Sequence, residues 1–193
     1  MGATIERGSV RVNALDADVI TPAAIATDAI DADALAADAI AEIAAALALI
    51  GAVPQLSHKS LTFTGAAGLG AVGNVPLFTV TGEVVVLAIV PYTTDSLTVG
   101  GQDDPTLALG VTNATALFIA ATLATNLLTG EFWTEPTGGG VANSGIAIPA
   151  ALKDIAITSN IVGTVVDHNI TGGTLRFDVY WRPLSAGASV TPV

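Results

Sequence analysis

The two histidines, His58 and His168, are the side chains of this sequence best suited to proton transfer near neutral pH. His168 stands in the run Asp167-His168-Asn169, where a carboxylate can orient an imidazole beside a serine nucleophile. No G-x-S-x-G segment supplies the strained turn that presents such a nucleophile, and neither a zinc helix motif nor an EF-hand spacing occurs. We therefore predict no enzymatic activity, no metal site and no cofactor, with both histidines in surface or capping roles.

Aromatic side chains offer a second kind of chemistry, because an aromatic ring can stack on the C–H face of a sugar. Trp133 and Tyr180 are the candidate glycan contacts. Trp181 is assigned to the core instead, because Leu175, Phe177, Val179 and Trp181 alternate with polar residues as one face of a strand.

The overall charge excludes one large class of function. The net charge is -11 and the chain holds only six Lys and Arg, whereas nucleic-acid binding needs clustered basic side chains. Charged residues make up 12% and hydrophobic residues 51%, so partners are expected to cover part of the surface. No Cys is available for disulfides or thiolate ligands, and the apolar run 43–53 is about half of a membrane span. The start, with Glu6 and Arg7, does not read as a signal peptide.

The elements that must carry these side chains begin with a five-residue repeat over 14–43. A large aliphatic residue returns at Leu15, Ile20, Ile25, Ile30, Leu35 and Ile40. Five residues advance an α-helix by about 500°, which scatters these side chains, and on a plain strand they would alternate faces. A strand-plus-turn unit suits the spacing, since an Asp stands two residues before most of them. Six pentads are too few for a single-chain solenoid, which favours several copies of the chain wound on one axis. A bundle of helices remains the alternative, because Ala has a high helix propensity.

From Ala36 the period changes to that of a coiled coil. Ala36, Ile40, Ile43, Leu47 and Ile50 follow at spacings of 4, 3, 4 and 3, and Gly51 and Pro54 end the pattern. We predict a helix over 35–50 that needs partner helices, because four turns are marginal in water. The predicted trimer contacts are Ile20, Ile25, Ile30, Leu35, Ile40, Ile43, Leu47 and Ile50.

The first thirteen residues form a separate arm before this stalk. They hold Arg7 and Arg11, the only basic residues of the first fifty, and an alternating segment around Val10 and Val12. We predict that Arg7, Val10, Arg11 and Val12 dock onto another protein, although a frayed terminus accounts for them equally well.

After a linker over 51–59, the remaining residues, 60–193, alternate short apolar segments with Gly, Asn, Asp and Pro clusters. Many short strands without long helices predict a mainly β fold, a jelly-roll-like β-sandwich. The expected strands are Ser60–Thr64, Leu77–Thr81, Glu83–Pro91, Ser96–Val99, Thr106–Val111, Ala116–Ala120, Glu131–Glu135, Ile146–Pro149, Asp154–Thr158, Ile161–Val166 and Thr174–Arg182. The segment from Glu83 is apolar on both faces, so it should lie centrally in its sheet or against another subunit.

The pentads from Ala24 to Ile43 resemble the low-complexity stalks of tailed-bacteriophage fibre and head-decoration proteins. The segments 61–73 and 180–184 are similar to the β-rich tips of such proteins. The resemblance implies a homotrimeric structural virion protein without enzymatic activity, assembled in the bacterial cytoplasm. Its expected partners are further copies of itself and the major capsid protein or another virion protein. A capsid head fibre or decoration protein is the first hypothesis, and a tail fibre or spike tip that binds host-surface glycans is the alternative.

Overall fold

The computed structural model describes residues 42–43, 53–101, 104–137 and 146–193. The chain divides into two compact units, Met1–Ala48 and Leu49–Val193. Glu42 and Ile43 are helical, and Ile43 is 65% exposed. The rest of the expected helix over 35–50, the pentads and the N-terminal arm lie outside the described residues, and in the described part no coiled coil is seen.

Among its described residues, the second unit contains nine strands, in which successive side chains point to opposite faces of the sheet. They are β1 (Gln55–Thr62), β2 (Gly73–Thr81), β3 (Val84–Val99), β4 (Thr106–Val111), β5 (Ala114–Leu123), β6 (Ile155–Ile157), β7 (Ile161–Val166), β8 (Ile170–Pro183) and β9 (Ser189–Pro192). Two short 3-10 helices, η1 (Ala124–Asn126) and η2 (Ala150–Leu152), lie in the connections. Within the described ranges, no helix is long and apolar enough to span a membrane.

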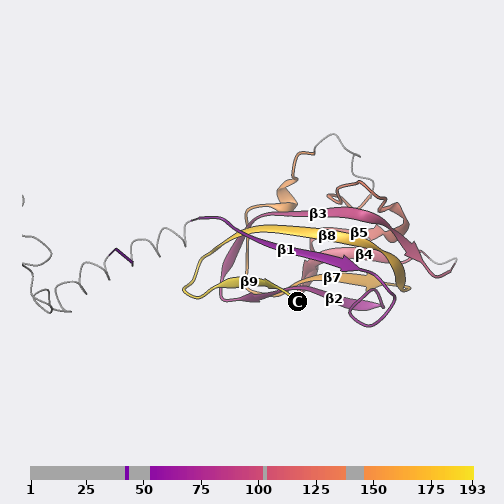
Figure 1. The fold of residues 1–193 in the computed structure, drawn as a ribbon, viewed down its shortest axis with the longest axis horizontal. Coiled ribbons are helices and arrows are strands. Elements are labelled where there is room, and N and C mark those ends of the chain that lie inside the picture. The colour runs from indigo at the N-terminus through magenta and orange to yellow at the C-terminus, as the bar shows by residue number, and fades with distance from the viewer. Residues whose placement is uncertain (1–41, 44–52, 102–103, 138–145) are drawn as a thin grey trace, which may run out of the picture. The chain divides into compact units, whose positions relative to one another are not determined.

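The strands form two antiparallel sheets that pack face to face. One sheet has the order β1-β8-β3-β6 and the other the order β5-β4-β7-β2-β9. Figure 1 shows β1, β8 and β3 side by side in one layer, with β9, β2 and β7 in the other. An eight-stranded jelly roll has this arrangement, with a β1-β8-β3-β6 sheet facing a β5-β4-β7-β2 sheet. Here β9 is added beside β2. The prediction of a mainly β, jelly-roll-like sandwich is confirmed.

Strand β8 shows why the sequence folds this way. Four of its inward side chains alternate along the strand, are at most 8% exposed and belong to the core between the sheets, namely Leu175, Phe177, Val179 and Trp181. Burying each such side chain contributes about 1.5–3 kcal/mol, which a one-residue slip of the strand would forfeit. The strand predicted from Glu83 is also central, because β3 lies between β8 and β6.

Some predicted boundaries were wrong. Strand β1 begins at Gln55, inside the predicted linker over 51–59. The segments predicted at 83–91 and 96–99 are one strand, β3, which follows β8 through several register shifts. The segments 131–135 and 146–149 are not strands, apart from one isolated bridge at Phe132, and β9 was not predicted at all.

Candidate functional site

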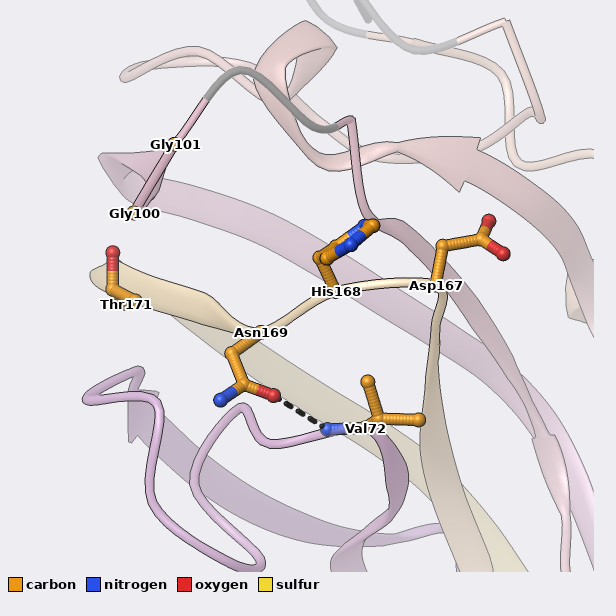
Figure 2. A pocket seen from close by; sticks show the side chains of 7 residues that line it. All are labelled: Val72, Gly100, Gly101, Asp167, His168, Asn169 and Thr171. Atoms are coloured by element: carbon orange, nitrogen blue, oxygen red, sulfur yellow. Dashed lines mark hydrogen bonds between the residues drawn. The ribbon is translucent and has the colours of Figure 1, made fainter.

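One end of the sandwich carries a pocket with a volume of about 310 Å³, at the small end of ligand sites. Three connections form it: the loop before β2, the end of β3 and the turn from β7 to β8. The lining residues are Val72, Gly100, Gly101, Asp167, His168, Asn169 and Thr171 (Figure 2). The run Asp167-His168-Asn169, singled out in the sequence, is therefore the turn that forms one wall of this pocket.

The turn is held in place by Asn169. Its Oδ1 accepts a hydrogen bond of 3.0 Å from the backbone N–H of Val72, and its Nδ2 donates to the carbonyl of Gly65 at 3.4 Å. Figure 2 shows the first of these bonds and shows Asp167 on the other side of His168 from Asn169. Asp167 has a φ of +73°, a left-handed conformation that Asp tolerates better than most residues. The amide of Asn169 therefore positions the pocket wall, whereas the Asp167 carboxylate is directed away from that bond.

The pocket offers hydrogen-bonding groups from its described lining residues. The Asp167 carboxylate accepts hydrogen bonds, and the Thr171 hydroxyl donates to the carbonyl of Thr98 at 3.4 Å while keeping lone pairs to accept. Ser57 is not near this turn: its Oγ is buried, donates to Val190 O at 2.6 Å and accepts from Trp181 Nε1. Among the described residues, no group of three His, Cys, Asp or Glu is placed to hold a metal ion.

The other histidine belongs to a chain of contacts on the outer face of the β1-β8-β3-β6 sheet. His58 Nδ1 lies 2.6 Å from Asp178 Oδ1, and Arg176 Nε lies 3.0 Å from Asp178 Oδ2, in a geometry that makes an ion pair without a hydrogen bond. The Arg176 guanidinium stacks 5.1 Å from the ring centre of Tyr92, which contacts Phe132 edge-on at 5.0 Å. This network orders the side chains of three strands and the loop after β5.

Of the two candidate glycan contacts, the structure supports the exposure of one. Tyr180 is 43% exposed on this outer face, beside Leu56 in the register of β1 and β8. Trp133 is 1% exposed, and its Nε1 donates a hydrogen bond of 2.9 Å to Thr122 Oγ1 inside the sandwich. The prediction that Trp133 contacts a glycan is corrected, because its ring has no face open to a ligand. The predicted place of Trp181 in the core is confirmed.

Most of the predicted interaction residues lie outside the part of the chain that the structure describes. Ile43 is described, as an exposed helical residue. The docking residues Arg7, Val10, Arg11 and Val12, and the trimer contacts Ile20, Ile25, Ile30, Leu35, Ile40, Leu47 and Ile50, stay predictions.

The pocket and the entry of the chain occupy opposite ends of the sandwich. In the register of β1 and β8, Gln55 pairs with Trp181, and Thr62 pairs with Thr174 close to the start of β8. The seven residue steps from Gln55 to Thr62 span about 23 Å of strand. The turn that precedes β8 therefore lies at the end of the sheet remote from the point where the chain enters β1. No sequence signal placed Val72 or Gly100 beside this turn, because the three connections are remote in the sequence.

No protein-family model and no curated protein matches the sequence. Among solved structures, the chain is similar to a chain of a cyanophage Pam1 capsid asymmetric unit, with 17% sequence identity and a TM-score of 0.44. The similarity covers 67% of this chain and 84% of that chain. At this distance the similarity carries neither activity nor partners from one protein to the other.

Proposed function

We propose that this chain is a structural, non-enzymatic protein of a tailed-bacteriophage particle, most specifically a capsid head fibre or decoration protein. In this role the N-terminal arm attaches to the major capsid protein or another virion protein, the repeats over 14–50 join three copies, and the jelly roll is displayed outward. The observation that carries the proposal is the arrangement of the sandwich: the chain enters at one end and a cluster of three connections lies at the other.

This arrangement suits a displayed domain, because a tether at one end leaves the opposite connections accessible to solvent. Loops carried by a rigid sandwich are common places for binding. Jelly rolls serve in viral capsid and lectin domains, although a fold does not by itself assign a function. The resemblance of the Ala/Asp pentads to phage stalks supplies the particular setting, and the strongly acidic charge favours solubility of many copies on one surface.

Mass spectrometry of purified particles tests the proposal. The protein should be present in a fixed copy number, and it should disappear from particles when Arg7 and Arg11 are both replaced by Glu, because these changes reverse the charge of the docking arm. A double replacement of Lys59 and Lys153 by Glu, on the sandwich, serves as the control and should leave the copy number unchanged. Absence of the unaltered protein from particles would contradict the proposal.

The second candidate is a tail fibre or spike tip that binds host-surface glycans. It is favoured by the pocket at the displayed end, where a carboxylate and a hydroxyl offer the hydrogen bonds that sugar hydroxyls need. Replacing Asp167 by Asn should then reduce binding of the protein to host cells at least tenfold, whereas replacing the exposed Leu184 by Ala should not. Tyr180→Ala gives the same test for the candidate ring contact. If both Asp167→Asn and Tyr180→Ala leave cell binding unchanged, the glycan-binding candidate is rejected.

A further inference from the structure

Strand β1 is the first part of the sandwich that a pull on the preceding chain would reach. The chain enters the sandwich at Gln55, and β1 lies at the edge of its sheet, beside β8. An edge strand has one row of unpaired backbone groups and a neighbouring strand on one side only, so it opens more readily than a central strand. The way in which β1 is fastened therefore decides how the sandwich responds to tension on the residues before it.

The ladder between β1 and β8 is long and regular. It holds eight consecutive residue pairs, from Gln55 opposite Trp181 to Thr62 opposite Thr174, without a register shift, and β1 runs beside β8 in Figure 1. The ladder between β3 and β8 contains four register shifts, and the ladder between β4 and β5 contains two. Hydrogen bonds of an antiparallel ladder stand perpendicular to the strands. A pull along β1 therefore loads all of these bonds together, whereas a pull across one end loads them in turn.

Side chains also fasten β1 to β8. On the outer face of the sheet, His58 Nδ1 lies 2.6 Å from Asp178 Oδ1, and the two residues stand opposite each other in the register. Towards the other end of β1, the hydroxyls of Thr62 and Thr174 are 3.1 Å apart and again stand directly opposite. Sliding that keeps the same side chains buried must move the strand by two residues, which separates each of these pairs by about 7 Å. These contacts therefore oppose sliding of β1 along β8.

Inward side chains fasten β1 to the other sheet as well. Ser57 is 8% exposed, and its Oγ donates to the carbonyl of Val190 at 2.6 Å while it accepts from Trp181 Nε1 at 2.9 Å. Lys59 Nζ donates to the carbonyl of Val193, the residue after β9. Strand β9 pairs with β2 in the second sheet. Although β1 is an edge strand, it is thus bonded to both layers of the sandwich.

We propose that β1 is a mechanical clamp, which passes tension from the attached chain to the whole sandwich and resists a pull along its own axis better than a pull across it. The inference rests on the proposed attachment of the protein through the residues before β1. It goes beyond that proposal, because it assigns a load-bearing function to one strand.

The direction of the load follows from the two ends of the ladder. Val53 and Gln55 lie at one end, and the turn over 167–169 leads into β8 beyond the other end. Tension between the attached chain and anything held at that turn pulls β1 and β8 past each other. Leu184 follows β8 at the same end as Gln55, so tension between Val53 and Leu184 peels the two strands apart instead.

Single-molecule force spectroscopy on the full-length chain tests the clamp. The sequence has no Cys, so two introduced thiols define the points of load. Val53→Cys with His168→Cys loads the ladder along β1, and Val53→Cys with Leu184→Cys loads it across; all three residues are exposed. The repeats before Val53 lie outside the loaded path. At one loading rate, the unfolding force should be about twofold higher or more for the first pair, because forced unfolding reports the unfolding rate.

A second comparison tests the side chains that fasten β1. In the first pair of handles, His58→Val with Thr62→Val removes two contacts between β1 and β8 and should lower the unfolding force. The matched control is Thr164→Val, which removes a hydrogen bond of 3.1 Å to Asn74 between β7 and β2 and should leave the force unchanged.

Equal forces for the two pairs of handles overturn the inference, as does a loss of force with Thr164→Val that equals the loss in β1. Circular dichroism checks that each variant folds. If His168→Cys does not fold, Gly101→Cys supplies a handle at the same end, because no atom lies within 4 Å of a Cβ there. Presence in virions is a separate result: absence from particles contradicts the virion role whatever the forces are, and equal forces reject the clamp in a protein that particles contain.

Discussion

Replacing Thr122 by Val should destabilise the sandwich by leaving a buried donor without an acceptor. Trp133 is 1% exposed, and its indole N–H donates to Thr122 Oγ1 at 2.9 Å. The Thr122 hydroxyl donates onward to Ala120 O at 3.1 Å, and the Trp133 backbone N–H donates to Pro91 O at 3.1 Å. Trp133 thus connects β5 of one sheet with β3 of the other, so the loop after β5 closes one side of the core.

The magnitude follows from these contacts. A buried N–H that loses its acceptor costs about 1–3 kcal/mol, and valine preserves the shape of threonine, so we expect Thr122→Val to cost about 2 kcal/mol. Trp133→Phe removes the donor and part of a buried ring, which should cost about 2–4 kcal/mol. The double variant should cost about 1 kcal/mol less than the sum, because removing both partners of a hydrogen bond leaves neither unpaired.

Urea unfolding at one fixed protein concentration, followed by tryptophan fluorescence and circular dichroism, measures these free energies. A comparison comes from Ser57→Ala, since Ser57 Oγ accepts from the indole of Trp181 at 2.9 Å in a position that is also buried. Additive costs in the Thr122 and Trp133 cycle would refute the bond. If Trp133→Phe left stability unaltered but abolished binding to host cells, Trp133 would be a glycan contact after all, against the burial of its ring.

Two other predictions concern backbone space and assembly. Gly173 has a φ of +95°, and a Cβ there would lie 2.4 Å from Ser96 O, so Gly173→Ala should cost about 3 kcal/mol or more in urea unfolding. Gly187 also has a positive φ, of +73°, but nothing lies within 4 Å of its Cβ position, so Gly187→Ala should cost only about 1 kcal/mol; equal costs would refute the steric argument. Ile40→Asp with Ile43→Asp should yield monomers or aggregates, because an unpaired charge is costly in an apolar contact, and an unchanged mass by light scattering would contradict the predicted coiled coil.

The sequence predicted several strands well, where a short apolar segment is bounded by turn residues. Strands β4 and β7 have the predicted bounds, and the alternation in β8 predicted which of its side chains are buried. Two apolar segments failed this logic. Residues 131–135 form only an isolated bridge to β3 at Phe132, and Trp133 bonds to a threonine on β5. Residues 146–149 form no strand, and Ile148 packs against the core. Periodicity cannot tell a buried connection from a strand when the segment is short.

The candidate site was only half predictable. The run Asp167-His168-Asn169 stood out by its side chains, but its neighbours in the pocket come from connections about seventy and a hundred residues away. Their meeting depends on the jelly-roll strand order, which no local pattern encodes. Burial of Trp133 was equally hidden, because an isolated tryptophan in an irregular segment has no alternating neighbours to show which way it points.

The pairing of β1 with β8 has a consequence for how the chain folds. Gln55 meets Trp181, so among the described strands the first one pairs with a strand more than a hundred residues later. Such distant pairings slow folding, because the entropy of closing a long loop is lost before the contacts form. While the chain is being synthesised, β3 lacks its main neighbour until β8 has left the ribosome, and its apolar side chains stay open to wrong pairings. We therefore expect refolding on the scale of milliseconds to seconds or slower, and yields that improve when expression is slowed by lower temperature.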